Sequence, residues 1–268
     1  MNLTYKEYTP SPALKPYVHC FWSLQADGFP NELSPVQRCF PSGMIEWITH
    51  VKGPSSIGFK DGRNFAFPQS LLTGICDRAT PYAVYGQSEM FGIRLNPEAA
   101  MDILEINLKA FRNSFLDTTC LNDRKAIFLN NQLLEASTHA ERIGQVEAFF
   151  INRLNRQNLV TNYFTEALRM LRSGDVPDIK ALSRKVYVGE RQLQRTFQNL
   201  LGISPKSYFR VVRLYRAHEM GLVNKSSFSD IAYSLGYSDP AHFTRDFKEY
   251  FGATPAAHFS STNLKAVA

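Results

Sequence analysis

The sequence lacks the apolar run of about 18 residues that a membrane-spanning helix needs. Its polar, proline-punctuated start, MNLTYKEYTPSPALKPY, shows no secretion-signal pattern. These absences predict a cytoplasmic protein with no membrane partner. The sequence also contains no Cys-x-x-Cys pair, which argues against a zinc knuckle or a redox pair. We therefore expect the four cysteines to be reduced and mostly buried: Cys20, Cys39, Cys76 and Cys120.

Catalytic motifs are absent as well. There is no Gly-rich phosphate loop, nucleophile elbow or Ser/His/Asp signature. Only His19 and His50 lie in the first hundred residues and no His-x-His occurs, whereas a metal-dependent β-barrel enzyme needs several converging ligands. A zinc site made by His19, Cys20 and Cys39 is the alternative, but its spacing matches no known pattern. We expect no enzyme activity, no cofactor and no metal.

Positive charge is placed unevenly along the 268 residues. The net charge of the chain is +6, and residues 161–268 hold 15 Lys and Arg against 9 Asp and Glu, whereas residues 1–160 hold 15 of each sign. The whole excess therefore lies in the C-terminal part. Such a basic segment beside a neutral one is typical of a nucleic-acid-binding module joined to a partner domain.

A short pattern occurs twice in this basic part. The first copy is DIKALSRKVYVGERQLQRTFQNLLGISP (Asp178–Pro205), and the second is SDIAYSLGYSDPAHFTRDFKEYFGATP (Ser229–Pro255). Matching residues at the end of each copy are 50 positions apart, for example Arg195 and Arg245. Matching residues at the start are 49 positions apart, for example Leu182 and Ile231. The second copy therefore has one extra residue in its turn.

Each copy has the pattern of a helix-turn-helix. A short apolar-periodic helix precedes a turn with a glycine, Gly189 or Gly236, and a second helix follows. The apolar residues of that second helix are spaced i and i+4, and so form one stripe: Leu193 with Phe197, and Phe243 with Phe247. The rest of the first copy's second helix carries Arg and Gln, which pair bidentately with guanine and adenine. In a single copy, these polar side chains could simply form a helix face exposed to solvent. Two copies at a nearly constant offset favour DNA binding instead.

These residues resemble the DNA-binding domain of the AraC/XylS family of bacterial transcription regulators. The second copy matches almost residue for residue, and GISPKSYFRVVRLYRAHEM (Gly202–Met220) resembles the family's linker helix. The resemblance implies seven helices with two recognition helices about 34 Å apart, which enter successive major-groove turns. Tyr187 stands where the family usually has Gly, and Gly189 where it usually has a Ser-type N-cap, so we expect a slightly altered first turn.

Positions carried over from the family give the candidate DNA contacts. The implied base-contacting residues are Arg191, Gln194 and Arg195 in the first motif, and Pro240, Ala241, His242, Thr244 and Arg245 in the second. The second set has few bidentate groups, so our hypothesis is that the first motif supplies more sequence discrimination and the second more phosphate anchoring. Candidate phosphate contacts are Arg210, Arg213, Arg216 and Lys248. Packing and intrahelical pairs are the alternative for the three arginines.

The N-terminal part is predicted to be β-rich. Aromatic and β-branched segments are separated by Gly and Pro clusters, which predicts short strands in an antiparallel barrel or sandwich. The expected strands are Tyr17–Leu24, Met44–Val51, Ser55–Phe59, Leu71–Cys76, Ala83–Tyr85 and Glu89–Leu95. Asn96 then fits an N-cap and Pro97 the first position of a helix. The fold class is therefore α+β, with an antiparallel β domain, a helical linker and an all-α domain.

This part resembles the cupin-like N-terminal domain of a subset of the same family. PSGMIEW (Pro41–Trp47), LTG (Leu72–Gly74) and FGIRLNPEAA (Phe91–Ala100) carry the match. The resemblance implies a domain that binds a small effector or mediates dimerisation. Glu46, Trp47 and Arg94 are the candidate effector-binding residues, since charges in apolar strands need partners. The alternative is a Glu46–Arg94 ion pair between two strands.

The expected domains are a β sensor or dimerisation domain (1–118), a helical linker (119–158), the DNA-binding domain (159–260) and a disordered tail (261–268). The linker shows two amphipathic helices, which either form a dimer contact or cover the β domain of their own chain. The sequence thus predicts a transcription regulator that binds double-stranded DNA, with RNA polymerase, a small effector and a second copy as candidate partners. The alternatives are a ligand-independent regulator and a metal cupin enzyme fused to a DNA-binding domain.

Overall fold

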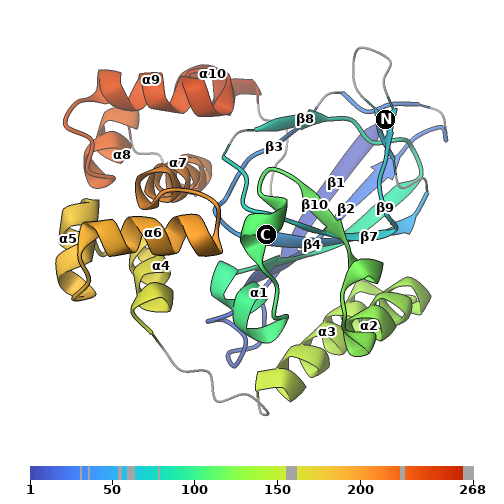
Figure 1. Cartoon of the computed structure of the whole chain (residues 1–268). Helices are drawn as coiled ribbons and strands as arrows, with labels where there is room; N and C mark the ends of the chain where they lie inside the picture. The colour runs from blue at the N-terminus through green and yellow to red at the C-terminus, as the bar shows by residue number, and fades with distance from the viewer. Residues whose placement is uncertain are drawn as a thin grey trace.

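The computed structural model describes residues 1–30, 32–35, 37–53, 56–58, 64–77, 79–154, 162–223 and 227–261. It confirms the α+β class, with an antiparallel β domain followed by a helical domain (Figure 1). The predicted boundary near residue 158 and nearly all of the predicted tail lie outside the described residues. Ser261, the first residue of that tail, instead ends the last helix.

The β domain is built on one six-stranded antiparallel sheet with the order β1-β2-β9-β4-β7-β10. Its strands are β1 (Asn2–Tyr8), β2 (Val18–Asp27), β4 (Ile45–Lys52), β7 (Ser70–Thr73), β9 (Ser88–Leu95) and β10 (Phe115–Asp117). Two short antiparallel ribbons accompany it: β3 (Gln37–Cys39) with β8 (Thr80–Tyr82), and β5 (Ser56–Gly58) with β6 (Asn64–Ala66).

The aromatic segments expected to be strands correspond to β2, β4, β7 and β9, whereas the polar start was not predicted to be a strand. It forms β1, which pairs with β2 from Asn2 opposite Asp27 to Tyr8 opposite Phe21. An edge strand pairs on one side only and tolerates a polar sequence. The strand expected at Ala83–Tyr85 instead ends at Tyr82, and Tyr85 makes a single bridge with Leu33.

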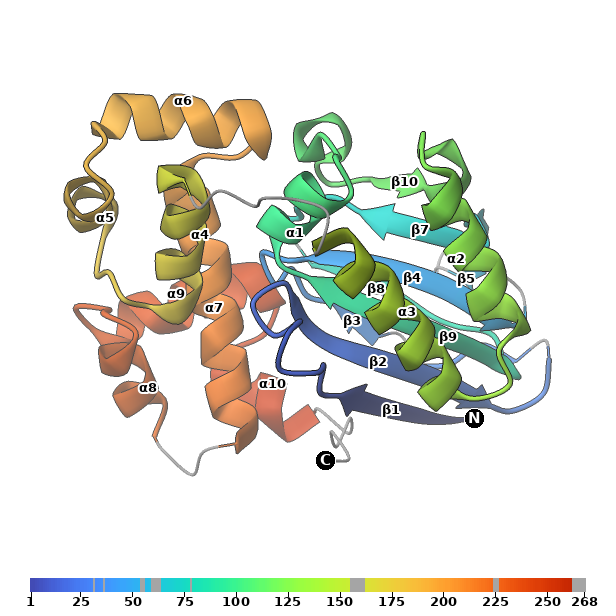
Figure 2. The same cartoon turned by 90° about the horizontal axis from the view of Figure 1, so that it is seen from below.

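Two helices, α2 (Arg124–Glu135) and α3 (His139–Leu154), cover one face of the sheet (Figure 2). The Trp47 indole of β4 donates to Ser70 Oγ at 3.0 Å and to Asn130 Oδ1 of α2 at 3.1 Å. Phe150 of α3 is fully buried. The predicted linker helices therefore cover the β domain of their own chain, which is one of the two roles expected for them.

A short helix, α1 (Pro97–Ile103), follows β9 as predicted. Asn96 precedes it with extended backbone, but its side chain makes no cap hydrogen bond. The Asn96 amide instead donates to Pro16 O at 2.7 Å, which ties the helix start to the segment before β2. Two 3₁₀ turns, η1 (Leu108–Phe111) and η2 (Thr118–Cys120), flank β10.

The described residues of the C-terminal domain form seven helices, the number that the resemblance implied. They are α4 (Tyr163–Ser173), α5 (Ile179–Lys185), α6 (Glu190–Leu200), α7 (Pro205–Val223), α8 (Phe228–Ser234), α9 (Pro240–Phe251) and α10 (Pro255–Ser261). The long central α7 contacts α4, α5, α6, α8 and α9. Gly174, with φ 78°, ends α4 as predicted, because glycine adopts this left-handed conformation without strain.

The two domains share one packed core. Arg172 of α4 forms an ion pair with Glu98 of α1. Tyr208 of α7 donates its hydroxyl to Gly43 O at 3.0 Å, and Tyr250 of α9 donates to Pro41 O. These contacts come from segments far apart in the sequence, and they hold α7 and α9 against the β domain.

The prediction that most of the four cysteines are buried is wrong. Cys20 is buried within β2, whereas Cys39 and Cys120 are exposed and Cys76 is partly buried. The exposed pair lies at the ends of short surface elements, β3 and η2, rather than in the sheet.

His218 of α7 lies in an aromatic cluster between the domains. Its ring is 5.6 Å from those of Phe40 and Phe251, and its Nδ1 is 3.1 Å from His258 Nε2. Burial, reinforced by His258, lowers the pKa of His218 to about 4. The neutral form is therefore the one that the folded protein favours.

We expect the free energy of unfolding to fall as the pH is lowered from about 6.5 to about 4, because unfolded His218 binds a proton in this window and folded His218 does not. A shift of this size corresponds to about 3 kcal/mol. Urea titrations at several pH values measure it, and His218→Gln should flatten the slope. His50, whose pKa burial also lowers to about 4, accounts for a remaining slope. An unchanged slope in His218→Gln would contradict this assignment.

Candidate nucleic-acid interface

Two helix-turn-helix motifs, α5–α6 and α8–α9, flank the central α7 (Figure 1). The second turn is one residue longer than the first, as the offsets predicted. Within each second helix, the predicted apolar stripe faces the core. Leu193, Phe197 and Phe247 are fully buried, and Phe243 is 1% exposed.

The polar faces of α6 and α9 remain open to solvent. All three predicted base-contacting residues of α6 are exposed: Arg191, Gln194 and Arg195. On α9, Ala241, His242, Arg245 and Lys248 are exposed, whereas Pro240 and Thr244 are half-buried. Because α6 presents two arginines and a glutamine and α9 presents fewer bidentate groups, the chemical difference noted in the sequence persists on the folded surface.

Both recognition helices start on the side away from the β domain. At the end of α6, Gly202 O accepts from Arg112 Nη1 at 2.8 Å, and near the end of α9, Tyr250 contacts Pro41. The C-terminal ends thus meet the β domain, and the N-terminal ends point to the opposite side in both views (Figures 1 and 2). N-terminal residues of recognition helices are the ones that contact base edges in helix-turn-helix proteins. The side away from the sheet is therefore the candidate DNA side.

The helix starts differ between the motifs. Asp239 Oδ1 accepts from His242 N at 2.7 Å and caps α9, and this backbone hydrogen bond lowers the pKa of Asp239. Gly189 precedes α6 without a side-chain cap bond. The first motif nevertheless keeps its turn, which agrees with the expectation of an altered but not lost geometry.

The candidate phosphate arginines of α7 are engaged within the protein. Arg210 Nε lies 2.5 Å from Asp246 Oδ1, and Arg213 Nη2 lies 3.6 Å from Asp246 Oδ2. The Arg213 guanidinium also covers the Tyr237 ring at 3.7 Å. Arg216 packs against Gly174 so closely that a Cβ atom on Gly174 would lie 1.7 Å from Arg216 Nη1. This arrangement matches the packing alternative and leaves exposed Lys248 as the better-placed phosphate contact.

Replacing Asp246 with asparagine is expected to destabilise the domain by about 1–3 kcal/mol, because it removes the charge that Arg210 and Arg213 face and weakens the 2.6 Å hydrogen bond from Tyr237 Oη. Thermal or urea unfolding measures the loss. Glu249→Gln is the matched control, because its side chain is 73% exposed although it also pairs with Arg210. Equal losses from both variants would show that Asp246 has no special role.

The predicted effector residues do not converge on one site. Glu46 Oε1 pairs with Arg94 Nε at 2.7 Å, and Glu46 Oε2 accepts from the Trp22 indole at 2.7 Å. Arg94 Nη1 also donates to Tyr215 Oη of α7 at 3.1 Å. Trp47 alternates to the opposite face of β4, toward α2. The ion-pair alternative is thus observed for Glu46 and Arg94, and Arg94 in addition links the sheet to α7.

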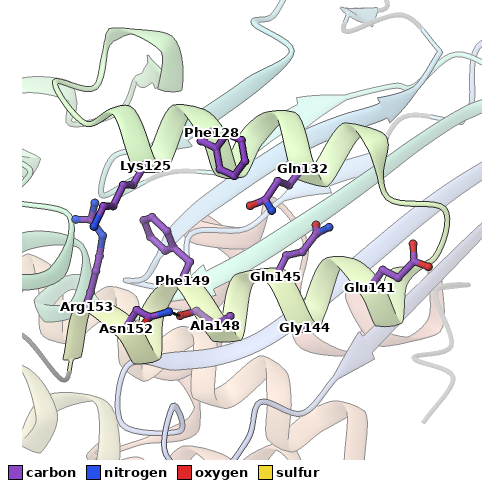
Figure 3. A pocket seen from close by; sticks show the side chains of 10 residues that line it. All are labelled: Lys125, Phe128, Gln132, Glu141, Gly144, Gln145, Ala148, Phe149, Asn152 and Arg153. Atoms are coloured by element: carbon purple, nitrogen blue, oxygen red, sulfur yellow. Dashed lines mark hydrogen bonds between the residues drawn. The ribbon is translucent and has the colours of Figure 1, made fainter.

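A groove between α2 and α3, with a volume of about 660 Å³, was not anticipated from the sequence (Figure 3). Phe128 of α2 and Phe149 of α3 lie in it, and the Arg153 guanidinium covers the Phe149 ring at 4.5 Å. Phe128 is 62% exposed. The sequence signal that could have found it is Phe128, a large apolar residue within the expected helical linker (119–158).

Among the described residues, no group of three or more His, Cys, Asp or Glu side chains is arranged to hold a metal ion. Across those same parts of the chain, none of the helices combines the length and hydropathy that crossing a membrane requires.

Comparison with known proteins finds a match for each part of the chain. Residues 182–260 match the model of a helix-turn-helix domain, and residues 6–117 match a domain of unknown function (DUF6597). The regulator GbdR of Pseudomonas aeruginosa is 36% identical over 78 residues, 29% of this chain and 21% of that protein. The lactose operon transcription activator of Staphylococcus xylosus is 30% identical over 88 residues, 32% of each chain. This chain thus matches about a third or less of the length of these relatives.

The solved structures that resemble this chain have low identity to it. The structure of ToxT from Vibrio cholerae is 12% identical, covers 97% of this chain and 98% of its own, and gives a TM-score of 0.48. An AraC-type DNA-binding domain from Chromobacterium violaceum is 25% identical over 38% of this chain and 94% of its own, with a TM-score of 0.35.

Proposed function

We propose that this chain, whose residues 182–260 form an AraC-type helix-turn-helix domain, is a transcription regulator that binds specific double-stranded DNA sequences. One observation carries the proposal. Two helix-turn-helix motifs are held by one central helix, and both present the N-terminal ends of their second helices on the side away from the β domain. A single chain can therefore contact two segments of one duplex.

The different roles proposed for α6 and α9 follow from the chemistry of their side chains. Arg191, Gln194 and Arg195 of α6 supply bidentate groups for guanine and adenine. On α9, Arg245 is the one bidentate group among the exposed candidates, and Lys248 supplies a point charge for phosphate. We assign most of the sequence discrimination to α6 and more of the phosphate anchoring to α9.

Selection from a random duplex pool with the purified protein, at a stated salt concentration, tests the proposed function. We expect one enriched site with two elements about 10 base pairs apart, since successive major-groove turns on one DNA face have this spacing. Binding that depends on salt but enriches no sequence would contradict specific recognition.

Control by a small effector belongs to the proposal. A second candidate function, regulation without a ligand, is favoured by a specific observation. Glu46 and Arg94 pair with each other, and Arg94 also contacts Tyr215 of the DNA-binding domain. This arrangement supports a ligand-independent regulator whose β domain serves as an interaction module. Thermal unfolding across a panel of small metabolites separates the two, because a ligand that binds the folded state raises the melting temperature. Metal analysis of the purified protein tests the metal-enzyme alternative.

A homodimer is also part of the proposal. The groove between α2 and α3 places exposed Phe128 beside Phe149 on a surface that faces solvent. A second copy would cover this apolar side chain. Sedimentation measures the association, and Phe128→Lys should shift the protein toward monomer. The proposal also includes RNA polymerase as a partner of the regulator and the cytoplasm as its location.

A further inference from the structure

We infer that Tyr187, in the turn of the first motif, is a DNA contact that donates its hydroxyl to a backbone phosphate beside α6. The inference rests on the proposed function, because it assumes that the helix-turn-helix domain binds a duplex. It concerns a residue outside the recognition helices, at a position where the resemblance leads one to expect glycine.

The first residues of the two turns adopt the same backbone conformation. Val186 and Leu235, which end the first helices, have φ/ψ of −90°/4° and −91°/5°. The residues after them, Tyr187 and Gly236, have φ of 56° and 77°. Both turns also make matching hydrogen bonds, from Val188 N to Ser183 O at 3.1 Å and from Tyr237 N to Ala232 O at 3.0 Å. The same left-handed position thus carries glycine in one motif and tyrosine in the other.

Tyrosine at this position strains the backbone, and no contact within the described parts of the fold compensates for that strain. A side chain disfavours the left-handed region, and glycine does not. The Tyr187 side chain is 95% exposed. Within the described parts of the chain it makes no side-chain hydrogen bond, ring contact or cation–π contact. Gly236 shows that the turn forms without it, so the reason for tyrosine lies outside the folded chain.

The location of Tyr187 identifies the partner. It lies two residues before Gly189, the N-cap of α6, and so on the side where both recognition helices start. When the first turn of such a helix enters the major groove, the residues just before it lie along the groove edge, where the phosphates are. Tyrosine is among the side chains that hydrogen-bond phosphate oxygens. Exposed Arg184, in the last turn of α5, adds positive charge beside it.

The test uses the full chain with its selected duplex and with a random duplex. Tyr187→Gly removes the side chain and the strain together, and Tyr187→Phe removes the hydroxyl alone. Phe29→Ala is the matched control, since it deletes another exposed aromatic (79% exposed) from the β domain. Each variant is measured for melting temperature, for Kd on both duplexes, and for the dependence of Kd on salt.

We expect Tyr187→Gly to keep or raise the melting temperature by about 1–3 °C, because the relief of strain offsets the flexibility of glycine. Its Kd should rise about 10-fold on both duplexes, with an unchanged salt slope, because tyrosine is neutral and releases no counterion. Tyr187→Phe should show most of this loss, and Phe29→Ala none. Tyr187→Gly that binds as tightly as the wild type would overturn the inference alone. Failure of the wild type to enrich any sequence would overturn the proposed function itself.

Discussion

Replacing Arg195 with alanine is expected to weaken binding to the selected duplex by about 10- to 100-fold, since each bidentate arginine–guanine pair contributes about 1–3 kcal/mol of discrimination. Binding to a random duplex should fall much less. Arg195 is exposed on α6, two residues before the buried Phe197, so its removal leaves the packing of the helix intact. Fluorescence anisotropy with both duplexes measures the two affinities.

Arg245 is the internal control for Arg195, because the two occupy matching positions of the repeat. Arg245→Ala should change the ratio of the two affinities by a smaller factor than Arg195→Ala does, because most of the sequence discrimination is assigned to α6. Equal loss of discrimination from the two variants would contradict the proposed division between α6 and α9.

Replacing Phe197 with alanine is expected to lower the free energy of unfolding by about 3–5 kcal/mol. The Phe197 side chain is fully buried, and its ring makes edge contacts with Phe164 of α4 at 5.0 Å and Tyr208 of α7 at 5.8 Å. Its loss leaves a cavity at the junction of three helices, and so also loosens the support of α6. Urea unfolding followed by circular dichroism measures the change.

Leu200 is the matched control on the same helix. Its side chain is 40% exposed, so Leu200→Ala should change the free energy of unfolding by no more than about 0.5 kcal/mol. If Phe197→Ala lost less than about 1 kcal/mol, the proposed packing of α6 against α4 and α7 would be wrong.

Local sequence signals were sufficient for the helical domain. The i, i+4 stripe of Leu193 and Phe197 and its repeat at Phe243 and Phe247 fixed which face of each recognition helix is buried. The glycine and proline positions predicted the helix ends, as at Gly174. These features depend on residues close together in the chain, and so they can be inferred from periodicity and turn chemistry.

Contacts between distant segments could not be predicted in this way. The polar start was not recognised as β1, because its stability comes from pairing with β2. The charges of Arg210 and Arg213 suggested phosphate, but tertiary packing places Asp246 beside them. Periodicity likewise could not show that Arg94 reaches Tyr215 in the other domain.

Hydroxyl-radical footprinting of the full chain on its selected duplex tests the central claim most directly. If one chain contacts DNA through both α6 and α9, the footprint shows two protected segments on one face, about 10 base pairs apart. Arg191→Ala combined with Arg195→Ala should then erase one segment and leave the other. A single protected segment in the wild type, or the loss of both segments in the double variant with its fold intact, would contradict the account.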